Sequence, residues 1–301
     1  MPQLLDLPPE LLAHVFSYFE DHEKAAKRPI CRALLPFTRR NLLARVQLGN
    51  FRPQRFNRFS RLLQPQKKHE AASLRATLVG DVPLGHHVRE LYIPNLDKQW
   101  QGAPYVDRAP TIKRILAELK ELEVLSVAGS DMAELLLPVA DTWVFLKLRR
   151  LHLLELDPNR VGLYDMDFLD RLRRFPSLKW LEHSFSTYAD DPEELHAEPA
   201  TALNVDPFGG IDTLALCAGH SLSTSQAANF ISHFTNLRTL HLSIVEGLSL
   251  FSFFGAVPSQ LVHLKIEYNV EVERATIHDD RALLLTGHIT RFTGLESLYL
   301  G

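Results

Sequence analysis

Residues 237–242 read LRTLHL, and this short phrase decides the fold of the chain. Alternate side chains of a β-strand point to opposite faces, so Leu240 and Leu242 would point into one core. The phrase, apolar-x-x-Leu-x-apolar, recurs with its middle leucine at positions 91, 125, 151, 214, 240, 264 and 298. A defective copy around Leu181 carries His183 in the last place. The sequence therefore predicts one buried strand that is repeated along the chain.

The segments before the strands have a second pattern, which is typical of helices. Ile112, Ile115, Leu116 and Leu119 follow helical spacing, and Ala227, Phe230, Ile231 and Phe234 repeat it. A large apolar residue stands three positions before six of the copies, at Leu119, Phe145, Phe175, Phe208, Phe234 and Phe292. One strand with one helix cannot bury its own apolar face, but stacked copies can. We therefore expect an α/β fold in which parallel strands alternate with helices.

The spacing between copies identifies the kind of repeat. The middle leucines are separated by 24 to 34 residues, which exceeds the usual length of about 20–29 residues in several places. The pattern resembles leucine-rich repeats of the long, irregular kind. Only Asn269 stands where such repeats carry an asparagine after the strand, so we expect an irregular strand ladder. A doubly wound α/β domain is the competing fold, and it is disfavoured because no glycine-rich strand-to-helix turn is present.

The N-terminal stretch Leu5–Phe19, LDLPPELLAHVFSYF, predicts an amphipathic helix. Asp6 suits the N-cap, and the two prolines that follow suit the first helical positions. The apolar residues after them form a broad stripe on one helical face. Because a short helix cannot hide this stripe alone, it needs a partner inside or outside the chain.

Order and spacing in residues 4–48 resemble an F-box. The segment opens L-P-x-E-L-L-x-x-V-F, continues to Ile30-Cys31-Arg32 and ends in Arg45-Val46-Gln47-Leu48. Lys27 and Leu34 depart from the family pattern. The resemblance implies a short helical unit that docks onto the Skp-family linker subunit of an SCF-type cullin-RING ubiquitin ligase. By motif position, the docking residues would be Leu7, Pro8, Leu11, Leu12, Val15, Phe16 and Ile30. The alternative is a generic helical cap on the larger domain.

Residues 49–86 connect this unit to the repeats. Six basic residues and no acid fall between Phe51 and Lys68: Arg52, Arg55, Arg58, Arg61, Lys67 and Lys68. A nucleic-acid surface is one interpretation. We favour an amphipathic helix that packs on the next domain, because the whole chain carries a net charge of -3. We therefore expect neither a nucleic acid nor a membrane as partner.

Two features of the repeat region remain open. The segment between Ser184 and Pro207 contains six acids without Lys or Arg, at Asp190, Asp191, Glu193, Glu194, Glu198 and Asp206. It predicts either a solvated loop or a contact for a basic partner. The sequence ends at Gly301, directly after a strand phrase, whereas solenoids normally end in a polar capping repeat. We expect either a longer natural chain or a partner that covers this edge.

Catalytic motifs give little support for an enzyme. Residues 219–223, Gly-His-Ser-Leu-Ser, lack the final glycine of a nucleophile elbow, so a hydrolase built on Ser221 is a minor hypothesis. No phosphate-binding loop or zinc-protease motif is present, and we predict no cofactor or metal. The two cysteines, Cys31 and Cys217, fit a reducing compartment. No signal peptide and no apolar run near the ~18 residues of a membrane span are visible, so we expect the cytoplasm or nucleus.

These observations predict a protein of three parts: an F-box at 1–48, a basic connector at 49–86, and a repeat domain at 87–301 that is truncated at its end. The predicted function is that of a substrate-recognition adaptor, not an enzyme. It would bind the linker subunit, and through it a cullin, while the repeats hold a protein target. A repeat scaffold without any ubiquitin role is the alternative.

Overall fold

The computed structural model describes residues 44–48, 78–79, 82–94, 109–129, 145–156, 172, 175–185, 210–218, 228, 230–244, 254–268, 287 and 289–300. The predicted docking residues from Leu7 to Ile30, the basic residues 52–68, the acidic segment 190–206 and Ser221 lie outside these residues.

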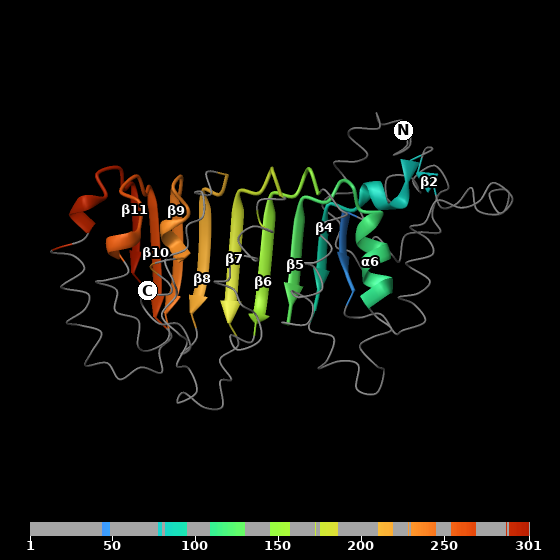
Figure 1. The fold of residues 1–301 in the computed structure, drawn as a ribbon, viewed down its shortest axis with the longest axis horizontal. Helices are drawn as coiled ribbons and strands as arrows, with labels where there is room; N and C mark the ends of the chain where they lie inside the picture. The colour runs from blue at the N-terminus through green and yellow to red at the C-terminus, as the bar shows by residue number, and fades with distance from the viewer. Residues whose placement is uncertain are drawn as a thin grey trace, which may run out of the picture. The chain divides into compact units, whose positions relative to one another are not determined.

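Nine of the described strands form one sheet, and from β4 onward neighbours in this sheet are neighbours in sequence (Figure 1). The strands in sheet order are β1 (Arg45–Gln47), β4 (Glu90–Ile93), β5 (Val124–Ala128), β6 (Arg150–Leu156), β7 (Trp180–Phe185), β8 (Thr213–Ala218), β9 (Thr239–Ile244), β10 (His263–Tyr268) and β11 (Ser297–Leu300). Pairing is parallel between β1 and β4 and at each step from β6 to β11. This arrangement is that of a repeat solenoid. A doubly wound fold requires a point at which the strand order reverses, and the described sheet has no such point.

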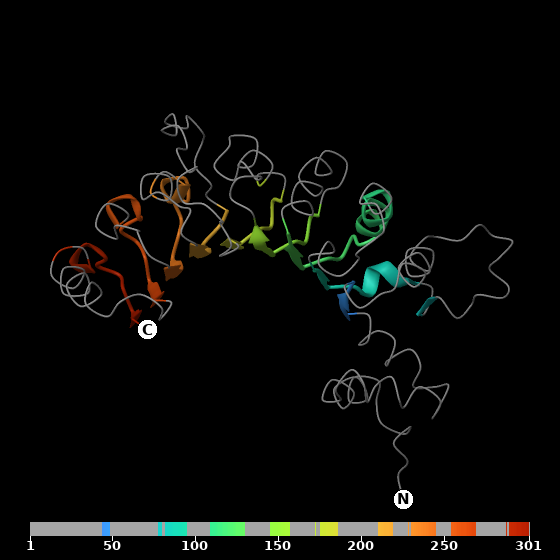
Figure 2. The same ribbon diagram turned by 90° about the horizontal axis from the view of Figure 1, so that it is seen from below.

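The chain divides into two compact units, residues 1–125 and 126–301, with β5 crossing the boundary. Each unit is described by itself below. In residues 126–301 the described helical turns, at 230–232, 254–256 and 289–291, lie on one side of the sheet (Figure 2).

The core of residues 126–301 confirms the strand phrase. Buried residues alternate along β6, β7, β9 and β10, as a period of two demands; β8 adds the buried Ala215, and β11 contains no buried residue. Register aligns the middle leucines, so that Leu214 pairs with Leu181 and with Leu240, and Leu240 pairs with Leu264. The buried strand positions are Leu151, Leu153, Leu181, His183, Leu214, Leu216, Leu240, Leu242, Leu264 and Ile266. Register is continuous from β7 to β11, and the irregularity expected from the missing asparagines is limited to one shift between β6 and β7.

A repeated turn explains the apolar residue that precedes each phrase. In five copies, those of Leu122, Leu148, Leu178, Leu237 and Leu295, the backbone N–H of the first leucine donates to the carbonyl three residues earlier, as in Leu178 to Phe175 (3.0 Å) and Leu237 to Phe234 (3.2 Å). The ring at this position is buried in both copies. The aromatic side chain thus closes the core beneath the turn that starts each strand.

The backbone entering each strand is also held by the next repeat. The carbonyl of Arg149 accepts hydrogen bonds from the N–H groups of Lys179 and Trp180, at 2.9 and 3.0 Å. Lys179, Asp212, Arg238 and Val262 repeat this double acceptance toward the following strand. The residues just before the strands therefore form a continuous row across the edge where the strands begin.

In residues 1–125 the core is built from helix α6 (Ala109–Ala117) and strands β1 and β4. The four apolar residues of the predicted helical spacing, Ile112, Ile115, Leu116 and Leu119, are all buried, which confirms that prediction. A 3-10 turn, η4 (Leu84–His87), leads into β4. The short strands β2 (Leu78–Val79) and β3 (Val82–Pro83) form a separate antiparallel pair that the sequence did not predict.

The short helical unit that the resemblance implies for residues 4–48 does not include residues 45–47. These residues form β1 and pair in parallel with β4, with Val46 opposite Leu91. Val46 and Leu48 are buried while Arg45 and Gln47 are exposed. The period is therefore two, and Leu43-x-x-Val46-x-Leu48 is a further copy of the strand phrase. The last residues of the segment that resembles an F-box are thus part of the sheet.

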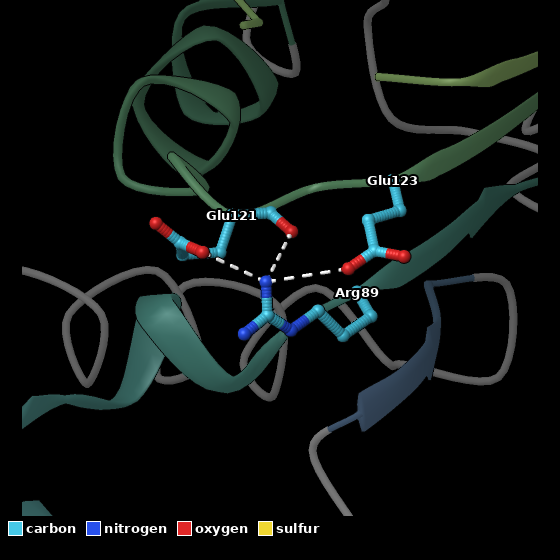
Figure 3. Close-up of polar contacts among 3 residues, drawn as sticks. All are labelled: Arg89, Glu121 and Glu123. Carbon is cyan, nitrogen blue, oxygen red and sulfur yellow. Dashed lines mark hydrogen bonds and ion pairs between the residues drawn. The ribbon is translucent and has the colours of Figure 1, made fainter. Parts of the chain in front are cut away.

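Arg89 joins the entry of β4 to the entry of β5 (Figure 3). Its Nη1 donates to the Glu121 carboxylate at 2.8 Å and to the Glu121 carbonyl at 3.1 Å, and lies 3.4 Å from Glu123 Oε1. The Arg89 carbonyl accepts hydrogen bonds from the N–H groups of Glu123 and Val124. One residue thus fixes the start of the next strand through both its side chain and its backbone.

Replacing Arg89 by alanine is expected to destabilise residues 1–125 by about 1 kcal/mol, because charge-assisted hydrogen bonds to a half-buried carboxylate are lost. The control is Arg45→Ala, which breaks the 2.9 Å ion pair between Arg45 and Glu90. The Arg45 side chain is 74% exposed. This change is expected to cost under about 0.5 kcal/mol. Urea unfolding followed by circular dichroism measures both, and equal losses would contradict the role of Arg89.

The described residues contain no helix long and apolar enough to cross a membrane.

Candidate partner-binding surface

The strands of residues 126–301 present a polar face opposite the buried leucines. Register places its residues in two rows across the sheet. The first row is Arg150, Trp180, Thr213, Thr239, His263 and Ser297, and the second is His152, Glu182, Ala215, His241, Lys265 and Tyr299. All of these residues except Ala215 are at least partly exposed. We call this set the polar strand face.

Trp180 is the centre of the polar strand face. Its ring stacks on His152, with centroids 6.4 Å apart, and meets the His241 ring edge-on at 5.9 Å. His241 stands two strands away, and β8 between them carries only Thr213 and Ala215 in these rows. The small side chains on β8 leave room for the indole to lie across that strand. Among the described residues no acceptor bonds the buried indole N–H.

Ionisable groups next to Trp180 are organised in pairs. His152 Nδ1 lies 2.6 Å from Glu182 Oε2, and this hydrogen bond lowers the pKa of Glu182. Burial of the Glu182 carboxyl opposes this lowering, whereas the nearby His241 contributes to it. Burial, together with the Lys265 charge, lowers the pKa of His241, so its ring is neutral at pH 7. Lys265 pairs with Glu267 at 2.7 Å and lies over the Tyr299 ring at 5.5 Å. Both carboxylates are therefore already engaged, Glu182 by His152 and Glu267 by Lys265.

Arg150 differs from the other charged residues of the face. Its guanidinium lies 5.2 Å from the centre of the Trp180 ring, a cation–π contact. Arg149 precedes it, and Lys179 and Arg238 hold the same place before β7 and β9; all four are exposed. In the described part of the chain none of these four forms an ion pair. A basic edge therefore borders the indole where the strands begin.

Catalytic chemistry finds no support on this face. Burial raises the pKa of the Cys217 thiol, which keeps it protonated and poorly nucleophilic. The described residues contain no cluster of three or more His, Cys, Asp or Glu that could hold a metal ion.

Sequence reasoning did not single out this surface. His183 was identified as the defect of its repeat, and it occupies the buried third position as that pattern predicts. Trp180, Glu182 and His241 belong to no motif, and only strand register brings them together. A scan against protein-family models finds no match for this chain, and a search of curated proteins finds none either.

Proposed function

We propose that this protein is a substrate-recognition adaptor of an SCF-type ubiquitin ligase. Residues 1–48 would dock onto the Skp-family linker through Leu7, Pro8, Leu11, Leu12, Val15, Phe16 and Ile30. The repeats would hold a protein target on the polar strand face. The observation that carries the proposal is this face, whose half-buried tryptophan and exposed arginine are of the residue types most often found at energetic centres of interfaces.

The mechanism would be proximity, not catalysis by this chain. A target held on the repeats, with residues 1–48 bound to the ligase, keeps a target lysine near the ubiquitin carrier. Linking two binding events in this way raises the effective concentration of the second by orders of magnitude. The bond-making chemistry then belongs to other subunits.

The test of linker docking is a pull-down with purified Skp-family linker protein. Leu11→Asp/Phe16→Asp places two charges in the predicted apolar stripe and is expected to abolish binding, because an unpaired buried charge is not tolerated. The control is Leu298→Asp/Tyr299→Asp, which alters an apolar pair in β11 that is 38% and 53% exposed. It is expected to retain binding. Circular dichroism verifies the repeat fold in both variants.

A second function has one observation in its favour. Because β1 pairs with β4, the end of the segment 1–48 is built into the repeat sheet. That favours a scaffold whose N-terminal residues serve as a cap, with no ubiquitin role. Failure of the wild-type chain to bind the linker would select this alternative.

A further inference from the structure

The basic edge forms one row in space although its residues are far apart in sequence. The Arg149 carbonyl accepts from Lys179, the Lys179 carbonyl from Asp212, and the Asp212 carbonyl from Arg238. Strands in a sheet lie about 4.8 Å apart, so this row spans roughly 15 Å, the length of four or five residues of extended chain. The edge thus has the size of a site for a short linear segment.

This row carries a net positive charge, whereas the whole chain carries a net charge of -3. Arg149, Lys179 and Arg238 stand in the row and Arg150 adjoins it; Asp212 is the acid among them, and Glu296 stands two strands beyond Arg238. The Thr213 hydroxyl donates to the Asp212 carboxylate at 2.9 Å. The whole chain has 36 Asp and Glu against 33 Lys and Arg. Exposed cations gathered without ion pairs in the described residues attract an acidic partner.

Trp180 supplies an anchor beside these cations. A flat or apolar side chain can pack on the exposed part of the indole, whereas a cationic one would meet the Arg150 guanidinium that already lies over the ring. The site therefore favours an aromatic residue flanked by acids.

A nucleic acid fits the site less well. Single strands are held by several successive aromatic platforms along a basic groove. Here one indole serves the row, and the carboxyl groups of Glu182 and Glu267 lie on the same face, where they disfavour a second stretch of phosphates. The positive charge is confined to one edge of the strands. The balance favours a short acidic peptide.

We propose that the basic edge and Trp180 bind an acidic linear peptide with a central aromatic residue. This inference rests on the proposed function in taking the peptide to be the recognition segment of the target. The site itself needs no ligase subunit. Under this proposal, the target that binds the polar strand face presents an acidic segment with an aromatic residue.

The test is fluorescence anisotropy with the full chain and labelled peptides of sequence DEFED, DEAED and KRFRK. DEFED is expected to bind saturably and to weaken about tenfold or more when salt rises from low to high concentration, because the cations are exposed. DEAED is expected to bind several-fold more weakly, and KRFRK not at all. Equal binding of DEFED and KRFRK, or no binding of DEFED, would overturn the proposal.

Matched variants locate the site. Trp180→Ala and Arg149→Glu/Arg150→Glu are each expected to weaken DEFED at least about tenfold, whereas Trp180→Phe keeps most of the affinity. Lys113→Glu/Lys120→Glu makes the same charge change at exposed positions of residues 1–125 and is expected to change affinity less than about twofold. Equal losses of DEFED affinity in both double variants would mean that the net charge of the chain, and not this site, determines binding, and would refute the site.

Two competing occupants are tested in the same assay. Tighter binding of a uridine oligomer than of DEFED would assign the edge to nucleic acid. Changing the six acids of 190–206 to their amides should leave DEFED affinity unchanged; a large gain would mean that the chain's own acidic segment fills the site. None of these measurements uses the linker protein, so loss of linker binding and loss of peptide binding are separate results.

Discussion

Replacing Leu240 by alanine is expected to destabilise residues 126–301 by about 3–5 kcal/mol, the usual cost of deleting a leucine side chain from a packed core. Leu240 is fully buried and is the middle leucine of its phrase. It lies between Leu214 and Leu264, its partners on the two neighbouring strands. Because both flanking strands are held in register, the cavity can close only slightly, and the cost falls at the upper part of that range.

The control uses the same position of the repeat in a different environment. Leu298 is the middle leucine of the last phrase, pairs with Leu264 and is 38% exposed. Leu298→Ala is expected to cost about 1 kcal/mol or less, since water already reaches the side chain. Urea unfolding of the full chain, followed by circular dichroism, compares the two variants. Similar losses of unfolding free energy in the two variants would contradict the different burial of Leu240 and Leu298.

The repeat architecture is predictable from sequence because burial imposes a period. Each strand has one buried face, so its leucines recur at every second position, and each turn needs one large apolar side chain to close the core. Leu240 and Leu242 show the strand period, and Phe234 is the large apolar side chain of the turn, all within nine residues. The helix over 109–117 is equally clear, because its apolar stripe has the helical period. Regular burial therefore produces a periodic sequence pattern from which the strands and the helix can be predicted.

The first strand was missed for a physical reason. Three residues are too few for a period to be distinguished, and Val46 fits a helical spacing with Leu42 as well as a strand spacing with Leu48. The pairing with β4 selects the strand, and β4 lies more than forty residues away. A tertiary contact of this kind overrides local preference and has no local signal.

The polar strand face could not be predicted at all. Its residues avoid the core and alternate with the buried leucines, but every outward strand position shares this spacing, so it marks none of them for binding. Trp180 and His241 meet only because β8 places small residues between them. Loops of unequal length separate the copies, so counting along the sequence does not give the register. A binding surface made from alternate strand positions needs the structure to be recognised.

His183 leads to the second large prediction, which concerns pH. It occupies a buried strand position where the other repeats carry an aliphatic residue, and burial lowers its pKa from 6.5 to about 3. The unfolded chain then takes up a proton near pH 6.5, whereas the folded chain does so only near pH 3. Folding stability is therefore unaffected above pH 6.5 and falls as the pH drops from 6.5 toward 3.

The expected loss is about 1.4 kcal/mol per pH unit in that interval, or roughly 2 kcal/mol at pH 5. His183→Leu restores the aliphatic residue of the repeat and is expected to remove this part of the pH dependence. The measurement is the urea midpoint of wild type and variant at pH 7.5 and pH 5.0.

The exposed histidine His263 provides the control, since His263→Leu changes the same residue types on the opposite face of the sheet. This variant is expected to lose as much stability as the wild type between the two pH values. If His183→Leu instead kept the full wild-type loss, the acid sensitivity would have to come from other groups. The buried imidazole would then take up its proton as readily in the folded chain as in the unfolded one, which its place among packed leucines argues against.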